Sequence, residues 1–172
     1  MRVALLPTGR TEWHGMAAAL ERLFPGHEFY CLPEQAEVVS NPERFPLRGF
    51  TSARLSATHE QQPPEDASEL LQRAAQEALG DRKRSAADLV VILDDVELAN
   101  RDQPERVVAV MRSAARKHLD SLRVHGVVKR TEEALRNSVS FHLIAPMIEA
   151  WFFTDDAALS QAGVERPETA QV

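Results

Sequence analysis

The chain has 172 residues, of which 44% are hydrophobic and 27% charged, and its formal net charge is −6. These proportions indicate a globular domain that can bury a core and exclude an intrinsically disordered chain. No apolar run approaches the roughly 20 residues that span a bilayer, so we expect no membrane segment. The N-terminal apolar stretch is too short for a signal peptide, and the single cysteine excludes a disulfide framework and a cysteine-rich zinc site. We therefore expect a cytoplasmic protein.

The N-terminal 32 residues predict a strand, a helix and a second strand. Arg2–Leu6 is a compact apolar run that ends at a Pro-Thr-Gly turn. Thr11 is placed to cap a helix with apolar residues at helical spacing, and His27–Leu32 predicts the second strand. Such a unit implies parallel pairing of the two strands through a right-handed crossover.

The middle of the chain is irregular. Residues 33–64 contain five prolines and are too long for an ordinary connection, so we expect an irregular insertion there. Pro64 is placed to open a helix that Gly80 ends.

The second half of the chain repeats the alternation of strands and helices. Asp88–Leu93 is apolar on both faces, as expected for a central parallel strand. Asp102 begins a capping-box pattern for the next helix, and Thr131 is placed to cap a shorter one. Val139–Ile144 predicts the fourth strand, and Pro146 is placed to open a final apolar helix.

Together these segments predict a single α/β domain over residues 1–172, with three layers and a mainly parallel, roughly four-stranded central sheet flanked by helices. Open sheets of this kind bind ligands at the carboxyl ends of their strands. The turn after the first strand, the acids after Leu93 and the segment after Ile144 should therefore emerge at one edge of the sheet.

An acidic cluster follows the central strand directly. Asp94, Asp95 and Glu97 repel one another when crowded at the end of a buried strand, and this costs stability unless a cation offsets the charge. Mg²⁺ and Mn²⁺ favour carboxylate oxygens and keep water ligands for substrate phosphates. The sequence therefore predicts a divalent-metal site here. The structural alternative is that the two aspartates cap the following turn while Glu97 is solvated.

Two further acids are candidates for the same edge. Glu12 lies in the turn after the first strand, where a helix N-terminus could also hold a phosphate, although the helix dipole alone favours an acid there. Glu149 stands among apolar and aromatic residues, so burial would require a partner such as a metal. It could equally lie on the solvated face of the predicted last helix.

Basic residues supply candidate phosphate contacts. Residues 101–136 contain nine Lys or Arg and five Asp or Glu, although such runs are commonly solvated helix faces. Arg10, Lys129 and Arg130 are the candidate substrate-binding residues. His142 is interpreted as a core histidine in preference to a ligand. The sequence contains no P-loop, G-x-G-x-x-G fingerprint or G-x-S-x-G nucleophile elbow.

Two motifs carry a resemblance to a known family. The Gly-x-Thr-Glu turn at residues 9–12, followed by Asp-Asp-x-Glu at residues 94–97, resembles a TOPRIM domain. That domain is the metal-binding α/β domain of topoisomerases, primases and nucleases of the overcoming-lysogenization-defect type. The segment HLIAPMIEAWFFTDDAAL, residues 142–159, is similar to part of a bacterial TOPRIM-like family of unknown function whose members are often associated with ATPases. The likeness extends over about residues 2 to 163.

The resemblance implies one or two Mg²⁺ or Mn²⁺ ions for phosphodiester chemistry. Glu12 takes the place of the TOPRIM glutamate in acid-base catalysis or metal binding, and Glu149 matches a C-terminal acid of the TOPRIM-like family. Asp95 and Glu97 take the Asp-x-Asp position, with Asp94 as the alternative register and with Glu in place of the second Asp.

The function implied by the resemblance is a metal-dependent nuclease or a related phosphodiester-processing enzyme. We expect it to act on nucleic acid, with DNA favoured over RNA, in phage defence beside an ATPase partner. The alternative is a non-catalytic TOPRIM-like subunit that binds a nucleotide or regulates an ATPase. A homo-oligomer is compatible with both.

Overall fold

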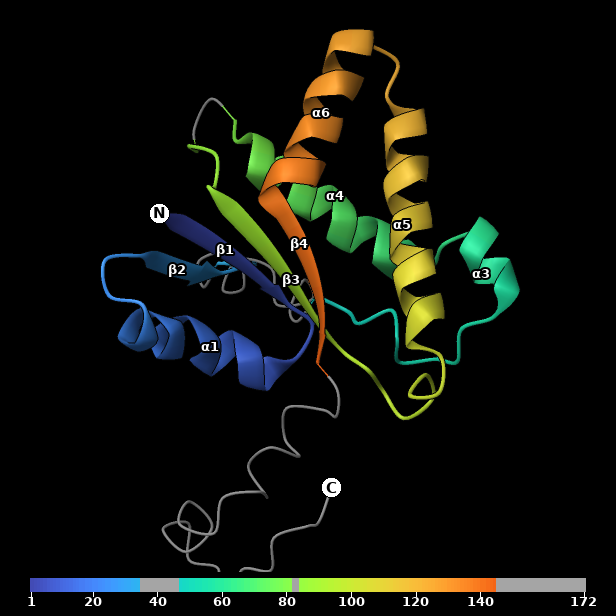
Figure 1. The fold of residues 1–172 in the computed structure, drawn as a ribbon, viewed down its shortest axis with the longest axis horizontal. Helices are drawn as coiled ribbons and strands as arrows, with labels where there is room; N and C mark the ends of the chain where they lie inside the picture. Colours follow the sequence, from blue (N-terminus) through green and yellow to red (C-terminus); the bar gives the residue numbers. More distant parts are fainter. Residues whose placement is uncertain (35–46, 82–83, 145–172) are drawn as a thin grey trace, which may run out of the picture.

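The computed structural model describes residues 1–34, 47–81 and 84–144 (Figure 1). All four predicted strands are confirmed, and the predicted last helix from Pro146 lies outside the described residues. In chain order the elements are β1 (Arg2–Pro7), α1 (Arg10–Leu23), β2 (Glu28–Cys31), α3 (Ala57–Gln61), α4 (Glu65–Leu79), β3 (Leu89–Asp95), α5 (Pro104–Ser121), α6 (His125–Ser138) and β4 (Val139–Ile144).

The four strands form one parallel sheet in the order β2-β1-β3-β4, which confirms the predicted α/β class. In this sheet Pro7 of β1 pairs with Leu93 of β3, and Asp95 of β3 pairs with Ile144 of β4. The register therefore brings the carboxyl ends of β1, β3 and β4 to one edge of the sheet, which we call the carboxyl edge. This edge is where ligands bind in open parallel sheets.

Helices α4, α5 and α6 cover one face of the sheet, and α1 lies on the other (Figure 1). The alternation of side chains along β3 sends Val90 and Ile92 toward α4, and both are fully buried. The apolar residues of α4 recur at the predicted helical spacing and face the same core, and Gly80 ends this helix as predicted. In the part of the chain that the structure describes, no helix is long and apolar enough to cross a bilayer.

Three predicted helix caps are wrong. Thr11 and Thr131 lie inside α1 and α6, and Thr131 is buried. Gln103 precedes the first residue of α5, while the Asp102 carboxylate accepts a hydrogen bond of 2.7 Å from Arg54. Threonine and aspartate accept hydrogen bonds from many donors, so their capping role depends on tertiary contacts that sequence spacing does not contain.

Candidate functional site

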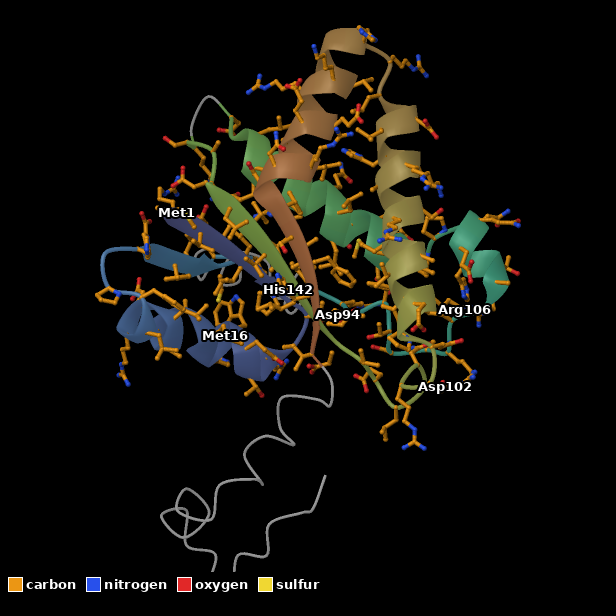
Figure 2. The ribbon with its side chains drawn as sticks, viewed as in Figure 1. Met1, Met16, Asp94, Asp102, Arg106 and His142 are labelled. Carbon is orange, nitrogen blue, oxygen red and sulfur yellow. The ribbon has the colours of Figure 1, made fainter. Side chains whose placement is uncertain are left out.

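Asp94 is the most deeply buried acid of the predicted cluster, with 1% of its surface exposed. It is the penultimate residue of β3, at the carboxyl edge (Figure 2). Its Oδ1 atom accepts a hydrogen bond of 2.7 Å from the hydroxyl of Thr8. The Thr8 N–H in turn donates to the carbonyl of Leu93 at 3.1 Å, which extends the pairing of β1 and β3 by one residue. Sheet register thus places the Asp94 carboxyl against the turn after β1.

Burial raises the pKa of Asp94 to about 6, because desolvation disfavours the charged carboxylate. The hydrogen bond from the Thr8 side chain opposes this rise, and the negative charge of Glu97 adds to it. A carboxyl with this pKa exchanges its proton near neutral pH. A cation that bound here would favour the ionised form.

Glu12 is the second buried acid of this edge, with 3% of its surface exposed, and it is the single buried residue of α1. Its carboxyl group folds back over Gly9, the residue that precedes α1. A Cβ atom at Gly9 would overlap Oε2 of Glu12 and lie 2.8 Å from its Cδ. The dipole of α1 favours a negative charge at this end, but the dipole does not require burial. A solvated Glu12 is therefore excluded.

Both buried acids carry an oxygen atom that accepts no hydrogen bond from residues 1–34, 47–81 or 84–144. Oε2 of Glu12 and Oδ2 of Asp94 are inaccessible to solvent and have no hydrogen-bond partner among the described residues. Oδ1 of Asp95 is in the same condition, although Asp95 makes other interactions. A buried carboxylate oxygen without a partner is costly, and native proteins normally satisfy such atoms with a donor or a cation. The arrangement therefore suits a proton or a metal ion.

Asp95 and Glu97 are less buried than Asp94. Asp95 ends β3, and its carbonyl accepts hydrogen bonds from the Thr51 hydroxyl at 2.7 Å and from the N–H of Glu97 at 3.0 Å. Side chains alternate along a strand, so Asp94 and Asp95 leave the sheet on opposite faces. Glu97 is half-buried in the following turn.

The four predicted acids that the structure describes, Glu12, Asp94, Asp95 and Glu97, are not gathered into one metal-binding cluster. Among the described residues, no group of three His, Cys, Asp or Glu side chains is close enough to hold a metal ion. Glu149, the fifth predicted ligand, lies outside those residues. The structure does bring two of the acids to the turn after β1. The Asp94 carboxyl contacts Thr8, and the Glu12 carboxyl covers Gly9, the next residue of that turn.

A loop of residues 47–56, within the irregular insertion expected from the sequence, completes the site. A Cβ atom at Gly49 would lie 2.7 Å from Oδ1 of Asp94, so the loop backbone comes close to that carboxyl. Asn100 is fully buried and holds the loop, because its side-chain amide donates to the carbonyls of Thr51 and Ala53 at 2.6 and 2.9 Å. The same side chain accepts a hydrogen bond of 2.9 Å from the N–H of Leu55. A lone asparagine after a strand gives no sequence signal for this role.

The predicted phosphate contacts are spread over two ends of the sheet. Arg10 is exposed and begins α1 at the carboxyl edge. Lys129 and Arg130 are exposed on α6, and Arg130 donates a hydrogen bond of 3.3 Å to the carbonyl of Leu79 at the end of α4. That end of α4 adjoins the start of β3, so these two residues lie away from the carboxyl edge.

His142 is exposed on β4, so the expected core position is wrong. One ring nitrogen, Nε2, lies 2.7 Å from the hydroxyl of Ser140. In a strand, residues two apart share a face, which explains this pairing.

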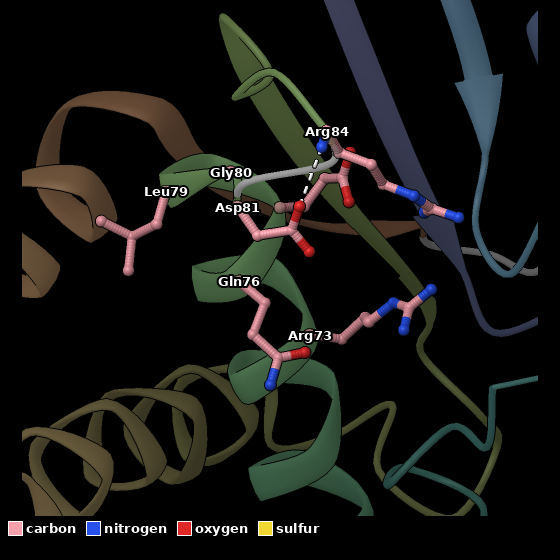
Figure 3. A pocket seen from close by; sticks show the side chains of 7 residues that line it. Arg73, Gln76, Leu79, Gly80, Asp81 and Arg84 are labelled. Carbon is pink, nitrogen blue, oxygen red and sulfur yellow. Dashed lines mark hydrogen bonds between the residues drawn. The ribbon is translucent and has the colours of Figure 1, made fainter.

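A polar hollow of about 590 Å³ lies at the amino end of β3 (Figure 3). Arg73 and Gln76 reach it from α4, and Asp81 accepts a hydrogen bond of 2.8 Å from the backbone N–H of Arg84. Gly80 begins this turn with a φ of +63°, in the region that favours glycine. The hollow is separate from the buried acids, which lie at the opposite end of the sheet.

No protein-family model, curated protein or solved structure matches this chain. The resemblance to TOPRIM domains therefore remains an expectation from the sequence motifs, and the candidate site depends on the geometry described above.

Proposed function

We propose that this chain is a TOPRIM-type, Mg²⁺- or Mn²⁺-dependent enzyme that processes phosphodiesters, with a DNA-cleaving nuclease as the favoured form. The observation that carries the proposal is the pair of buried acids at the carboxyl edge. Glu12 and Asp94 each keep a buried carboxylate oxygen that accepts no hydrogen bond from the described part of the chain. The two carboxyl groups lie against successive residues of one turn, Thr8 and Gly9, and helix capping does not require two buried oxygens of this kind.

The residues at this edge fit the needs of a hard divalent cation. Mg²⁺ in phosphate-processing sites binds through one or two carboxylates and completes its shell with water and substrate phosphate. A cluster of three protein ligands is therefore not required, and a site built on Glu12, on Asp94 or on both would meet this need. Bound there, the cation would supply an activated water and stabilise the leaving oxygen.

Other residues at the same edge have supporting roles in this proposal. Asp95 and Glu97 occupy the positions that the TOPRIM resemblance marks as catalytic, one and three residues after Asp94. Their negative charge attracts the cation, and Glu97 already raises the pKa of Asp94. Arg10 is exposed two residues before Glu12 and is placed to contact a substrate phosphate. Three parts of the proposal come from the sequence alone. The TOPRIM resemblance supports the phage-defence setting and the ATPase partner, and the composition supports a cytoplasmic location.

The test is cleavage of plasmid DNA and of RNA with Mg²⁺ or Mn²⁺. We compare the wild type with Glu12→Gln, Asp94→Asn and Asp95→Ala, and use Asp120→Asn on the exposed surface of α5 as the matched control. Loss of one ligand or supporting acid at a metal site lowers affinity or activity by about 10- to 100-fold. We expect that loss in the first three variants and none in the control. Cleavage that is unchanged in Glu12→Gln and Asp94→Asn would refute the site.

A second function has a specific observation in its favour. Because no three described acids are close enough to hold a metal ion, the chain could be a non-catalytic subunit that binds a nucleotide or an ATPase partner. Calorimetric titration with Mn²⁺ separates the two proposals. A nuclease requires Mn²⁺ binding and a rise in melting temperature, since a ligand stabilises the folded state it binds. Absence of both favours the binding subunit.

A further inference from the structure

The described residues cover one apolar face of the sheet only in part. Val91 and Leu93 of β3 and Ile144 of β4 line a groove of about 570 Å³, whose wall on the α1 side includes Met16 and Leu20. We call this surface the open face. It lies opposite α4, α5 and α6, and α1 covers its β1 and β2 side (Figure 1).

The open face departs from the usual pattern of a parallel sheet, in which helices cover both faces. On β3, Val90 and Ile92 are fully buried under α4, whereas Val91 and Leu93 on the other side are only half-buried. Phe24, which also lines the groove, keeps 52% of its surface exposed. An apolar sheet face that the described helices leave open is a place where another segment or molecule can bind.

We propose that residues 146–159 of the same chain dock on the open face and complete the third layer. The chain leaves β4 at Ile144, which lines the groove itself, and 28 residues follow it. The N–H of Val96 donates to the carbonyl of Ile144 at 2.9 Å, so the segment starts from a fixed point at the carboxyl edge. The segment therefore begins beside the groove.

The composition and length of the segment fit the groove. Ile148, Trp151 and Phe152 follow the i, i+3, i+4 spacing of one helix face. Fourteen residues of helix span about 21 Å, and the seven residues of β3 span about 23 Å. A helix of this segment would therefore cover the exposed side of β3 from end to end. The proposal is independent of the nuclease activity, because it concerns packing and not the buried acids.

The test uses Trp151 as a reporter in the full-length chain. The sequence has two tryptophans, so Trp13→Phe leaves Trp151 as the single one. Docking predicts a blue-shifted emission for Trp151 and protection from acrylamide quenching. Val91→Asp places a charge on the open face and should raise the quenching constant several-fold. Val127→Asp, the same change on the exposed surface of α6, should leave it unchanged.

Three results would overturn the proposal. The first is solvent-exposed emission of Trp151 in the parent protein. The second is emission that shifts red on dilution, because a second copy would then be the occupant. The third is buried emission that neither open-face variant changes. Since Val91→Asp could prevent folding, circular dichroism is recorded for each variant, and Met16→Glu on the α1 wall provides the second open-face variant.

Discussion

Thr8 and Asp94 are 86 residues apart in the sequence, and the hydroxyl of Thr8 donates a hydrogen bond of 2.7 Å to Oδ1 of Asp94. This contact joins the turn after β1 to the end of β3. The neighbouring turn residue Gly9 lies beneath the Glu12 carboxyl. One short turn therefore positions both buried acids, and changes within it should affect stability and metal binding together.

The raised pKa of Asp94 makes stability depend on pH. Its pKa is about 6 in the folded protein, against about 3.9 in an unfolded chain. The stabilisation from this group is therefore fully present below pH 3.9 or so and is lost as the pH rises through about 6, a loss of about 3 kcal/mol. Asp94→Asn cannot ionise, so it should gain stability relative to the wild type over this range. The measurement is denaturant unfolding of both proteins in EDTA from acid to neutral pH; a constant difference between them would contradict the assignment.

Removing the Thr8 hydroxyl should destabilise the site. Thr8→Val leaves the Asp94 carboxylate with one hydrogen bond fewer, and a bond to a charged group contributes about 1.5–3 kcal/mol. We expect that loss at pH 7.5 and a smaller one at pH 4.5, where Asp94 is protonated. Ser52→Ala removes an exposed hydroxyl from the adjacent loop and should change stability by less than about 0.5 kcal/mol. Equal losses at the two pH values would show that Thr8 does not act through the Asp94 charge.

Gly9 should tolerate no side chain, for reasons of space and not of backbone conformation. Its φ of −103° and ψ of 152° suit any residue, but a Cβ atom would overlap the Glu12 carboxyl. We expect Gly9→Ala to cost about 1–3 kcal/mol of unfolding free energy and to weaken Mn²⁺ binding. Gly15→Ala, in the same helix with no atom near its Cβ position, should instead stabilise by about 0.5–1 kcal/mol. If both alanine variants behave alike, the Glu12 carboxyl does not lie over Gly9.

The four strands could be predicted from the sequence, and so could the edge of the sheet at which Glu12 and Asp94 lie. A compact apolar run such as Asp88–Leu93 is distinctive, and the order of strands and helices restricts the sheet to few topologies. Because the carboxyl ends of parallel strands share an edge, Glu12 and Asp94 could be assigned to the same edge before the structure was known. Their burial could not be predicted from the sequence. For Glu12, an acid in the first turn of a helix has the same sequence pattern whether it is solvated or enclosed.

Contacts between distant loops were beyond prediction from the sequence. Gly49 approaches Asp94 from the Pro-rich insertion, and Asn100 is the residue that fixes this loop. Neither follows a periodic pattern, because their positions depend on hydrogen bonds between segments far apart in the chain. The predicted cap at Asp102 was wrong for the same reason, because its carboxylate forms an ion pair with Arg54 of that loop.

Asn100 and Arg54 both connect the loop of residues 47–56 to the segment after β3, and they allow a matched comparison. The buried Asn100 side chain makes hydrogen bonds to Thr51, Ala53 and Leu55, and Asn100→Ala would leave those groups unsatisfied at a cost of order 3 kcal/mol. Arg54 pairs with Asp102 where both side chains are more than half exposed and solvent screens the ion pair, so Arg54→Ala should cost much less stability than Asn100→Ala. Since the loop approaches Asp94, Asn100→Ala should also weaken Mn²⁺ binding, whereas Arg54→Ala should not. Urea unfolding and Mn²⁺ titration of both variants provide the measurement. Equal effects would mean that the exposed ion pair, and not the buried amide, holds the loop over the acids.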